Sequence, residues 1–127
     1  MANNVLLLIA RVLLAAIFVV SGIFKFVDLG GTAGYISSVG LPAAGVLAFL
    51  AAAFETVGGL AILVGFQTRI VSYLLAAFCV FTAFVFHGAP DQINQIMLMK
   101  NLAIAGGFLS LAIGGAGALS LDGRRAA

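Results

Sequence analysis

Four long apolar runs dominate the sequence, and short polar or glycine-rich stretches separate them. The runs cover about residues 5–27, 43–65, 69–86 and 96–116. Each is close to the ~20 residues that a helix needs to cross the hydrocarbon core of a bilayer. The runs are continuously apolar rather than alternating, and backbone groups in lipid must be satisfied within the structure, so we predict helices and not strands. The expected fold class is therefore all-α, with four transmembrane helices in an antiparallel, up-down bundle.

The stretch between the first two runs has a different character. Residues 28–41 are rich in glycine and serine, which predicts an interfacial turn or a short helix on the membrane surface. Pro42 follows directly, and proline suits the first turn of the next helix. Arg11 interrupts the first run, which continues to Val27, so we interpret this run as a retained transmembrane helix rather than a cleaved signal. We expect one transmembrane domain over residues 1–127.

Composition agrees with a membrane protein and excludes several function classes. The chain is 64% hydrophobic and 8% charged, whereas a soluble domain carries roughly 25% charged residues, so we expect the lipid bilayer as a partner. The few cations form no basic cluster, which argues against nucleic-acid binding. The single cysteine, Cys79, cannot form an internal disulfide or a Cys-x-x-Cys pair, and the single His87 excludes bis-histidine haem ligation within one chain. We predict no metal site, because nothing fixes His87, Met97 and Met99 in a copper-binding geometry.

The charges near the ends of the runs predict the orientation in the membrane. With four spans, both termini and the loop between the second and third runs lie on one side. That side has more cations: Arg11, Arg69, Arg124 and Arg125. The other side has Lys25 and Lys100, partly offset by Asp28 and Asp91. The positive-inside rule therefore places both termini in the cytoplasm.

One carboxylate, Glu55, lies deep in the second run, where a charge is costly and marks a functional-site hypothesis. It lies about ten residues from the cytoplasmic end, and Arg11 about seven residues into the first run, roughly 15 and 10 Å of helix rise. Since the two helices are antiparallel, we predict an Arg11–Glu55 ion pair inside the bundle. Two roles stay open: the pair orients the helices, or Glu55 also serves as a proton carrier, and so a candidate catalytic residue, or as a ligand anchor.

Small and amide residues near this pair are further candidates. Gly58 and Gly59 follow Glu55 by one turn, where they either allow close helix packing or leave room for a flat ligand. Asn101 lies on a stripe of the fourth run, from which it can hydrogen-bond across helices or contact a ligand. We therefore predict a ligand-binding set of Arg11, Glu55, Gly58, Gly59 and Asn101.

Four other polar residues are assigned structural roles. Lys25 is near the outer end of the first run and can snorkel to the membrane surface. Lys100 is expected to pair with an outer-loop aspartate, Asp28 or Asp91. His87 is expected to cap the outer loop, and Arg69 closes the polar turn after the second run.

Several of these residues stand in a pattern that resembles the DoxX family of small four-helix membrane proteins. The matching pieces are Arg11-x-Leu13, Phe18 and Gly22-x-x-Lys25; Glu55-x-x-Gly58-Gly59-x-x-Leu63-x-x-Gly65 with Thr68-Arg69; and His87, Lys100-Asn101 and Gly106-Gly107-x-Leu109. The resemblance covers nearly the whole chain in order. It implies a four-helix bundle in the bacterial inner membrane and redox chemistry, because the family takes its name from a subunit associated with thiosulfate:quinone oxidoreductase.

Three functions remain open at this point. The first is a membrane redox accessory that holds a quinone near Glu55 and Arg11, with a redox protein partner supplying electrons because the chain has no redox group of its own. In this case the bound cofactor is a quinone, with a lipid as the alternative occupant. The second is a non-enzymatic scaffold or assembly subunit. The third is a small-solute pathway, which requires a homo-oligomer because four short helices leave little lumen.

Overall fold

The computed structural model describes residues 2–126, and within them helices are the only regular elements. The helices are α1 (Ala2–Val27), α2 (Leu29–Ser38), α3 (Ala44–Val64), α4 (Thr68–Phe86), α5 (Gln92–Gly114) and α6 (Leu121–Ala126). Four of them, α1, α3, α4 and α5, are long and apolar enough to cross a membrane. The predicted all-α class with four spanning helices is confirmed, and the stretch between the first two spans forms the short helix α2.

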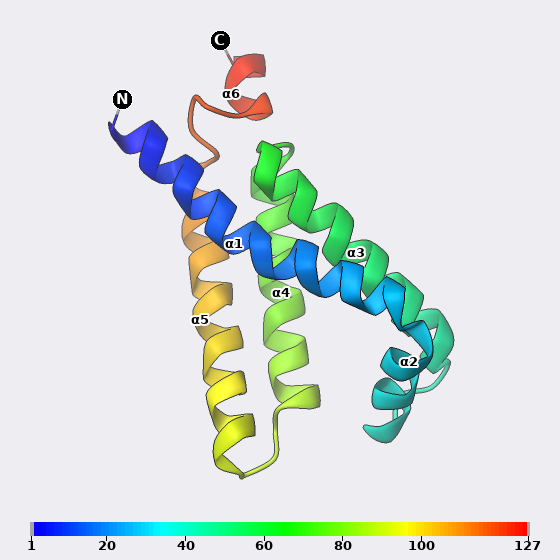
Figure 1. Cartoon of the computed structure of the whole chain (residues 1–127). Coiled ribbons are helices and arrows are strands. Elements are labelled where there is room, and N and C mark those ends of the chain that lie inside the picture. Colours follow the sequence, from blue (N-terminus) through cyan, green and yellow to red (C-terminus); the bar gives the residue numbers. More distant parts are fainter. Residues whose placement is uncertain (1, 127) are drawn as a thin grey trace.

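The helices form two antiparallel pairs. The closest contacts join α1 to α3 and α4 to α5, and α2 packs mainly on α3. Figure 1 shows the two pairs diverging toward the end of the molecule that carries α2. Both described ends of the chain, together with the α3–α4 turn, lie at the opposite end, which we call the termini end. This is the up-down order that four consecutive spans predict.

Close packing within the α1–α3 pair depends on glycine. A methyl group at Gly22 would lie 2.7 Å from the backbone nitrogen of Thr56, and one at Gly59 would lie 3.0 Å from the backbone nitrogen of Val19. Small residues of this kind let helix backbones approach in lipid, where burying apolar surface gives no advantage over lipid itself. The two contacts also fix the register, since they set Gly22 opposite Thr56 and Val19 opposite Gly59.

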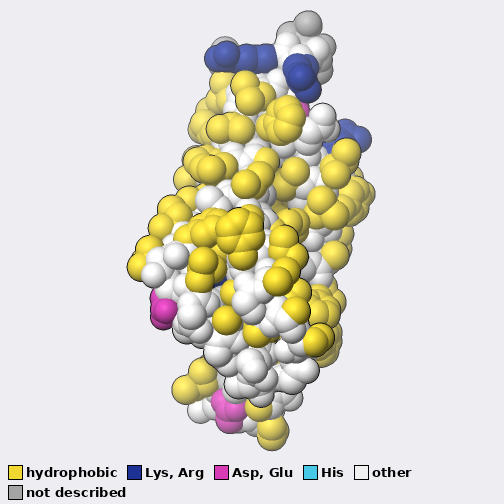
Figure 2. All heavy atoms as spheres, turned by 90° about the vertical axis from the view of Figure 1, so that its right-hand side faces the viewer, with side chains coloured by type: hydrophobic (Ala, Val, Ile, Leu, Met, Phe, Trp, Pro, Cys, Tyr) yellow, Lys and Arg dark blue, Asp and Glu magenta, His cyan; other side chains and the backbone are white. Residues whose placement is uncertain are grey.

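A small core lies where the helix pairs cross, and apolar side chains cover the outside. Phe18 of α1 packs edge-to-face on Phe108 of α5, with ring centroids 5.4 Å apart. Large apolar side chains such as Leu13, Phe24 and Ile113 remain exposed, and Figure 2 shows apolar atoms over most of one face. Four spans with an apolar outer surface indicate that this surface contacts lipid.

Arg11 is fully buried at the termini end, where it binds the end of α3. Its Nη1 donates to the carbonyl oxygens of Leu63 (3.1 Å) and Ile62 (3.4 Å), and its Nη2 donates to Leu119. Gly65 leaves room for it: its φ is +72°, and a side chain there would lie 2.5 Å from Nη1. The last carbonyls of a helix lack partners within the helix, so a cation satisfies both their hydrogen bonds and the helix dipole.

The predicted Arg11–Glu55 pair is therefore wrong. Arg11 lies beside Gly65, whereas Thr56, the neighbour of Glu55, lies opposite Gly22. Gly22 is about 11 residues further along α1, which separates the two charges by roughly 16 Å along the helix axis. The error came from aligning the ends of the two apolar runs, because the first turns of α1 extend past the end of α3.

Asp122 holds the other side of the same turn. Its Oδ1 accepts from the backbone nitrogen of Gln67 (2.9 Å) and its Oδ2 from that of Thr68 (2.8 Å), so it caps the start of α4. Burial raises the pKa of Asp122, but the hydrogen bonds from Thr68 and Gln67 and the charge of Arg125 outweigh it, and the pKa lies below its ordinary value. The α3–α4 turn is thus clamped by one cation and one anion from distant parts of the chain.

Candidate ligand-binding cavity

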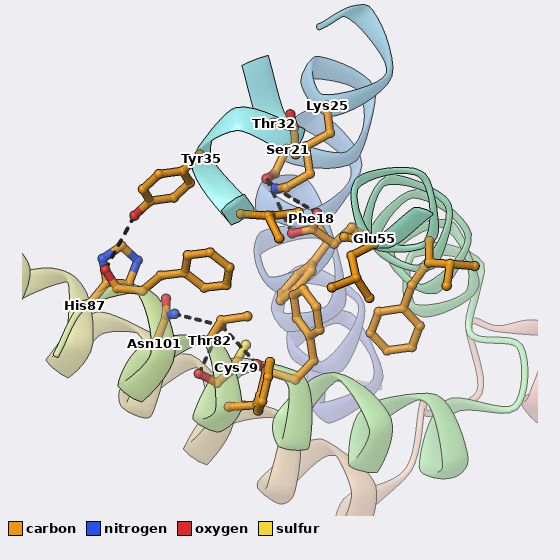
Figure 3. Close-up of a pocket in the computed structure, with 18 of the residues that line it drawn as sticks. Phe18, Ser21, Lys25, Thr32, Tyr35, Glu55, Cys79, Thr82, His87 and Asn101 are labelled. Atoms are coloured by element: carbon orange, nitrogen blue, oxygen red, sulfur yellow. Dashed lines mark hydrogen bonds and ion pairs between the residues drawn. The ribbon is translucent and has the colours of Figure 1, made fainter. Parts of the chain in front are cut away.

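A cavity of about 700 Å³ lies between the two helix pairs at the end that carries α2. Its walls come from α1 to α5 and are mainly apolar and aromatic (Figure 3). The aromatic residues of the wall are Phe18, Tyr35, Phe54, Phe78, Phe81 and Phe86. A volume of this size is within the ~300–1,000 Å³ typical of small-molecule sites.

The α1–α3 side of the cavity carries an ion pair. Lys25 Nζ lies 2.8 Å from Glu55 Oε2 and donates to Ser21 Oγ at 2.8 Å, while Ser21 Oγ donates to Glu55 Oε1 at 3.4 Å. Ser21 and Lys25 are one helical turn apart, so they share a face of α1. Glu55 is 5% exposed. The partner of the buried carboxylate is therefore Lys25, which was expected only to snorkel to the membrane surface.

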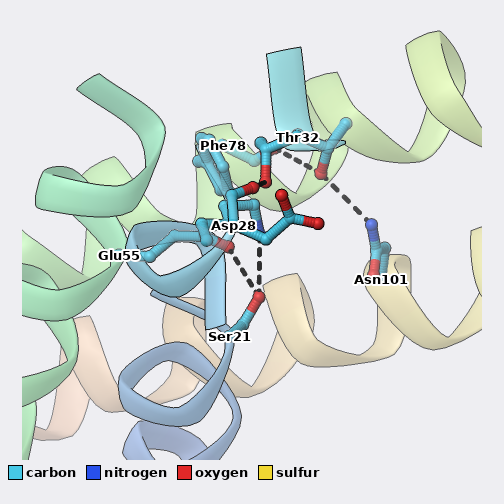
Figure 4. A network of polar contacts seen from close by, with 8 residues as sticks. Ser21, Asp28, Thr32, Glu55, Phe78 and Asn101 are labelled. Carbon is cyan, nitrogen blue, oxygen red and sulfur yellow. Dashed lines mark hydrogen bonds and ion pairs between the residues drawn. The ribbon is translucent and has the colours of Figure 1, made fainter. Parts of the chain in front are cut away.

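The α4–α5 side of the cavity carries a second polar group. Asn101 Nδ2 donates to Thr82 Oγ1 at 3.2 Å, across from α5 to α4. The Thr82 hydroxyl can donate to the carbonyl of Phe78 (2.9 Å) or Cys79 (3.2 Å) on its own helix. Figure 4 shows Asn101 approaching from one side, with Ser21 and Glu55 on the other. The structure thus shows the cross-helix hydrogen bond expected of Asn101.

Two aromatic residues mark the outer part of the cavity. Tyr35 of α2 stacks at 5.2 Å between ring centroids on Phe86 of α4, and its hydroxyl donates to the Phe86 carbonyl at 3.4 Å. His87 is the C-cap residue of α4, and its Nδ1 lies 3.2 Å from Asn94 Oδ1 of α5. Both Tyr35 and His87 line the cavity. His87 thus stands at the end of the hairpin, as expected, and also faces the cavity.

Three members of the predicted ligand-binding set lie outside these walls. Arg11 is at the termini end, Gly59 packs on Val19, and a side chain at Gly58 would meet Leu75 of α4 at 3.2 Å. The two glycines therefore serve helix packing and do not line the cavity. Glu55 and Asn101 are the two members of the set that line the cavity.

The remaining charged candidates are exposed or differently paired. Arg69 and Lys100 are both exposed, and Lys100 forms no ion pair within the described part of the chain. The expected Lys100 pairing with an aspartate is wrong, because both aspartates cap helices. Asp28 accepts from Gly31 at the start of α2, and Asp91 accepts from Asn94 at the start of α5.

Sequence reasoning missed Ser21, Thr82 and Tyr35 in the cavity and Asp122 at the termini end. The position of Ser21 could have been predicted from the sequence, since it lies four residues before Lys25 and so on the same face of the helix. Thr82 and Tyr35 did not, because a single hydroxyl in an apolar helix or a glycine-rich segment is common. Over residues 2–126, no three His, Cys, Asp or Glu side chains come close enough to hold a metal ion together.

Fold and cavity together define a small multi-pass membrane protein with a ligand-sized, mainly apolar cavity between its helices, in whose wall a few polar side chains lie. The model of the DoxX family matches residues 6–88, and the chain belongs to that family. It is 43% identical to "Inner membrane protein YqjF" of Escherichia coli (strain K12) over 94% of this chain and 92% of the relative. It is 39% identical to "Inner membrane protein YphA" of the same organism, over 97% and 92%.

A third relative carries a name that refers to activity. "Putative oxidoreductase CatD" of Bacillus subtilis (strain 168) is 41% identical over 69 residues, which cover 54% of this chain and 50% of the relative. No solved structure matches the chain. The family match, the two inner-membrane relatives and the four apolar helices make this chain a DoxX-type integral protein of the bacterial inner membrane.

Proposed function

We propose that the cavity binds a quinone and that the chain works as a quinone-linked accessory subunit of a membrane redox system. The observation that carries this proposal is the Lys25–Glu55 ion pair in the wall of an aromatic cavity of about 700 Å³. The cavity opens among membrane-spanning helices, where a hydrophobic ligand is already concentrated. A flat ring suits walls of phenylalanine and tyrosine, since aromatic rings stack on one another.

The ion pair favours an uncharged ligand that carries oxygen. Lys25 and Glu55 together have no net charge, so an anionic lipid headgroup would gain from the lysine but meet the carboxylate. A quinone carbonyl can accept from Lys25, and the hydroxyl of a quinol can donate to Glu55. The pair therefore suits both redox states of one ligand.

The same residues can handle the protons of the redox step. Reduction of a quinone to a quinol takes up two electrons and two protons. A partner redox protein would supply the electrons, because one cysteine and one histidine give neither a cysteine pair nor a bis-histidine haem site within one chain. Glu55 would exchange one of the two protons at the quinone oxygen beside Lys25, and water would exchange the other at the second oxygen. The name of the Bacillus subtilis relative, "Putative oxidoreductase CatD", supports a redox role.

Bound quinone tests the proposal directly. The protein is purified in mild detergent, organic extracts are analysed by mass spectrometry, and binding of an added short-tail quinone is measured by equilibrium dialysis. We expect the wild type to retain quinone. The variants Glu55→Gln and Lys25→Met should each bind the added quinone at least about tenfold more weakly, a loss of about 1.4 kcal/mol. Lys100→Gln, an exposed lysine at the same end, is the matched control and should bind as the wild type does.

A wild-type protein that carries no quinone and binds none would refute the proposal. Extraction of a phospholipid in a one-to-one ratio would do so as well, since it would assign the cavity to a lipid. Circular dichroism of each variant establishes that the helices are intact.

A further inference from the structure

The cavity has two polar groups, and they stand on different helix pairs. Lys25 and Glu55 lie on the α1–α3 side, and Asn101 with Thr82 lies on the α4–α5 side (Figures 3 and 4). In the function proposed above, only the first group contacts the quinone. The second group also lines the cavity, and its hydrogen bonds leave a donor and an acceptor of Asn101 unused.

Thr82 determines which atoms of Asn101 are free. The Thr82 hydroxyl donates to a carbonyl of its own helix, so toward Asn101 it can only accept. The amide nitrogen of Asn101 therefore points at Thr82. An amide has two N–H donors and one carbonyl acceptor, and one donor is used. Within residues 2–126, the other donor and the carbonyl oxygen of Asn101 make no hydrogen bond.

A free donor beside a free acceptor matches the chemistry of the ion pair. Asn101 can donate to a carbonyl oxygen or accept from a hydroxyl, as Lys25 and Glu55 can together. Each side of the cavity can thus bind an oxygen that alternates between C=O and C–O–H. A ring with one such oxygen at each end is the para-quinone and quinol pair.

We propose that Asn101, oriented by Thr82, is a specificity-determining residue that binds the second oxygen of the quinone ring. This inference rests on the proposed function and adds the ligand class: a ring with two opposed oxygens, bound at one end by α1 and α3 and at the other by α5. The ligand would then bridge the two helix pairs, which contact each other less than the helices within each pair do.

Two matched probes test the second contact. 1,4-Naphthoquinone has two opposed carbonyls, and 1-tetralone keeps the fused ring system with one carbonyl. We expect the wild type to bind naphthoquinone about five- to tenfold more tightly than tetralone, the effect of one added hydrogen bond. Asn101→Leu should weaken naphthoquinone binding by that factor and leave tetralone binding unchanged. Thr82→Val should give a smaller change in the same direction.

The ratio of the two affinities is measured within each variant, so a partly misfolded sample does not imitate the effect. Lys25→Met should weaken both probes together, and Lys100→Gln should change neither. If the ratio of naphthoquinone to tetralone affinity is the same in Asn101→Leu as in the wild type, Asn101 has no role in specificity, while binding of naphthoquinone by both proteins would still support the proposed function. If the wild type binds neither probe nor any quinone, the proposed function itself fails.

Discussion

Replacing Lys25 by methionine removes the partner of a buried carboxylate, and this change distinguishes the observed ion pair from the one that the sequence suggested. Methionine keeps the length of the side chain and removes the charge. At 2.8 Å the attraction between Lys25 and Glu55 is about 6 kcal/mol for an effective dielectric constant of 20. Desolvation of the two groups offsets much of this, so we expect the net loss to be smaller.

The net loss is set by what happens to the partner that remains. Removing one member of a buried ion pair leaves the other charge uncompensated, which is strongly destabilising. We expect Lys25→Met to lower the free energy of unfolding by about 2–4 kcal/mol at pH 7.

The assay is a double-mutant cycle, with unfolding in mixed detergent micelles followed by circular dichroism at 222 nm. Glu55→Leu alone should cost about 1 kcal/mol or less, because the Lys25 side chain is already 28% exposed and can extend to water. Lys25→Met with Glu55→Leu should be close to Glu55→Leu alone, since an apolar pair replaces the ion pair at little cost.

Arg11→Met provides the contrast. It leaves the carbonyls of Ile62, Leu63 and Leu119 without their charged donor and should cost about 2–4 kcal/mol. Adding Glu55→Leu to it should give no rescue, because the two sites lie far apart and their effects add. Rescue of Arg11→Met by Glu55→Leu, together with no rescue of Lys25→Met, would refute our assignment of the pair.

Other predictions concern the clamp, the packing, the outer aromatic contact and the orientation. Asp122→Ala should lower the free energy of unfolding by about 1–2 kcal/mol at pH 7 by removing the cap of α4. Because the pKa of Asp122 is depressed in the fold, the difference in stability between variant and wild type should fade as the pH falls below about 4. The unfolding midpoint of both proteins, measured at each pH, tests this. Gly22→Ala should cost about 1–3 kcal/mol in the same assay, whereas Gly106→Ala, which has open space around it, should be neutral or slightly stabilising. A thiol crosslink between Tyr35→Cys and Phe86→Cys, made in a Cys79→Ser background, should slow quinone exchange reversibly, because both residues line the cavity and join α2 to α4; unchanged exchange would show that this contact does not control access to the cavity. A fluorescent protein fused after Ala127 should be bright and a phosphatase fused there inactive, since the Lys and Arg side chains visible in Figure 2 gather mainly at the termini end.

The fold was predictable because a bilayer permits few structures. Long apolar runs in lipid must be helices, and consecutive spans must alternate in direction. The helix ends agreed with the predicted runs to within a few residues, and the largest difference is at α5. It begins at Gln92 because Asp91 caps a polar first turn that hydropathy alone leaves out.

The candidate site was less predictable, since it depends on how far one helix slides along another. Contacts of single glycines set this register, and sequence periodicity does not report it. Arg11 and Lys25 are 14 residues apart, which puts them on one face of α1, but this spacing does not say which of them meets Glu55. The partners of Arg11 are backbone carbonyls, which carry no sequence signal at all.

The buried polar groups differ in kind between the two ends of the molecule. At the termini end, Arg11 and Asp122 bind the backbone groups that helix ends leave unpaired, so they complete the fold. At the other end, Lys25, Glu55 and Asn101 bind side chains and line a cavity. Stability alone does not require an ion pair here, because a well-packed apolar pair can replace a buried ion pair at little cost. In the function that we propose, a ligand would use the free hydrogen-bond donors and acceptors of these side chains, and this is the role that the helix ends do not give them.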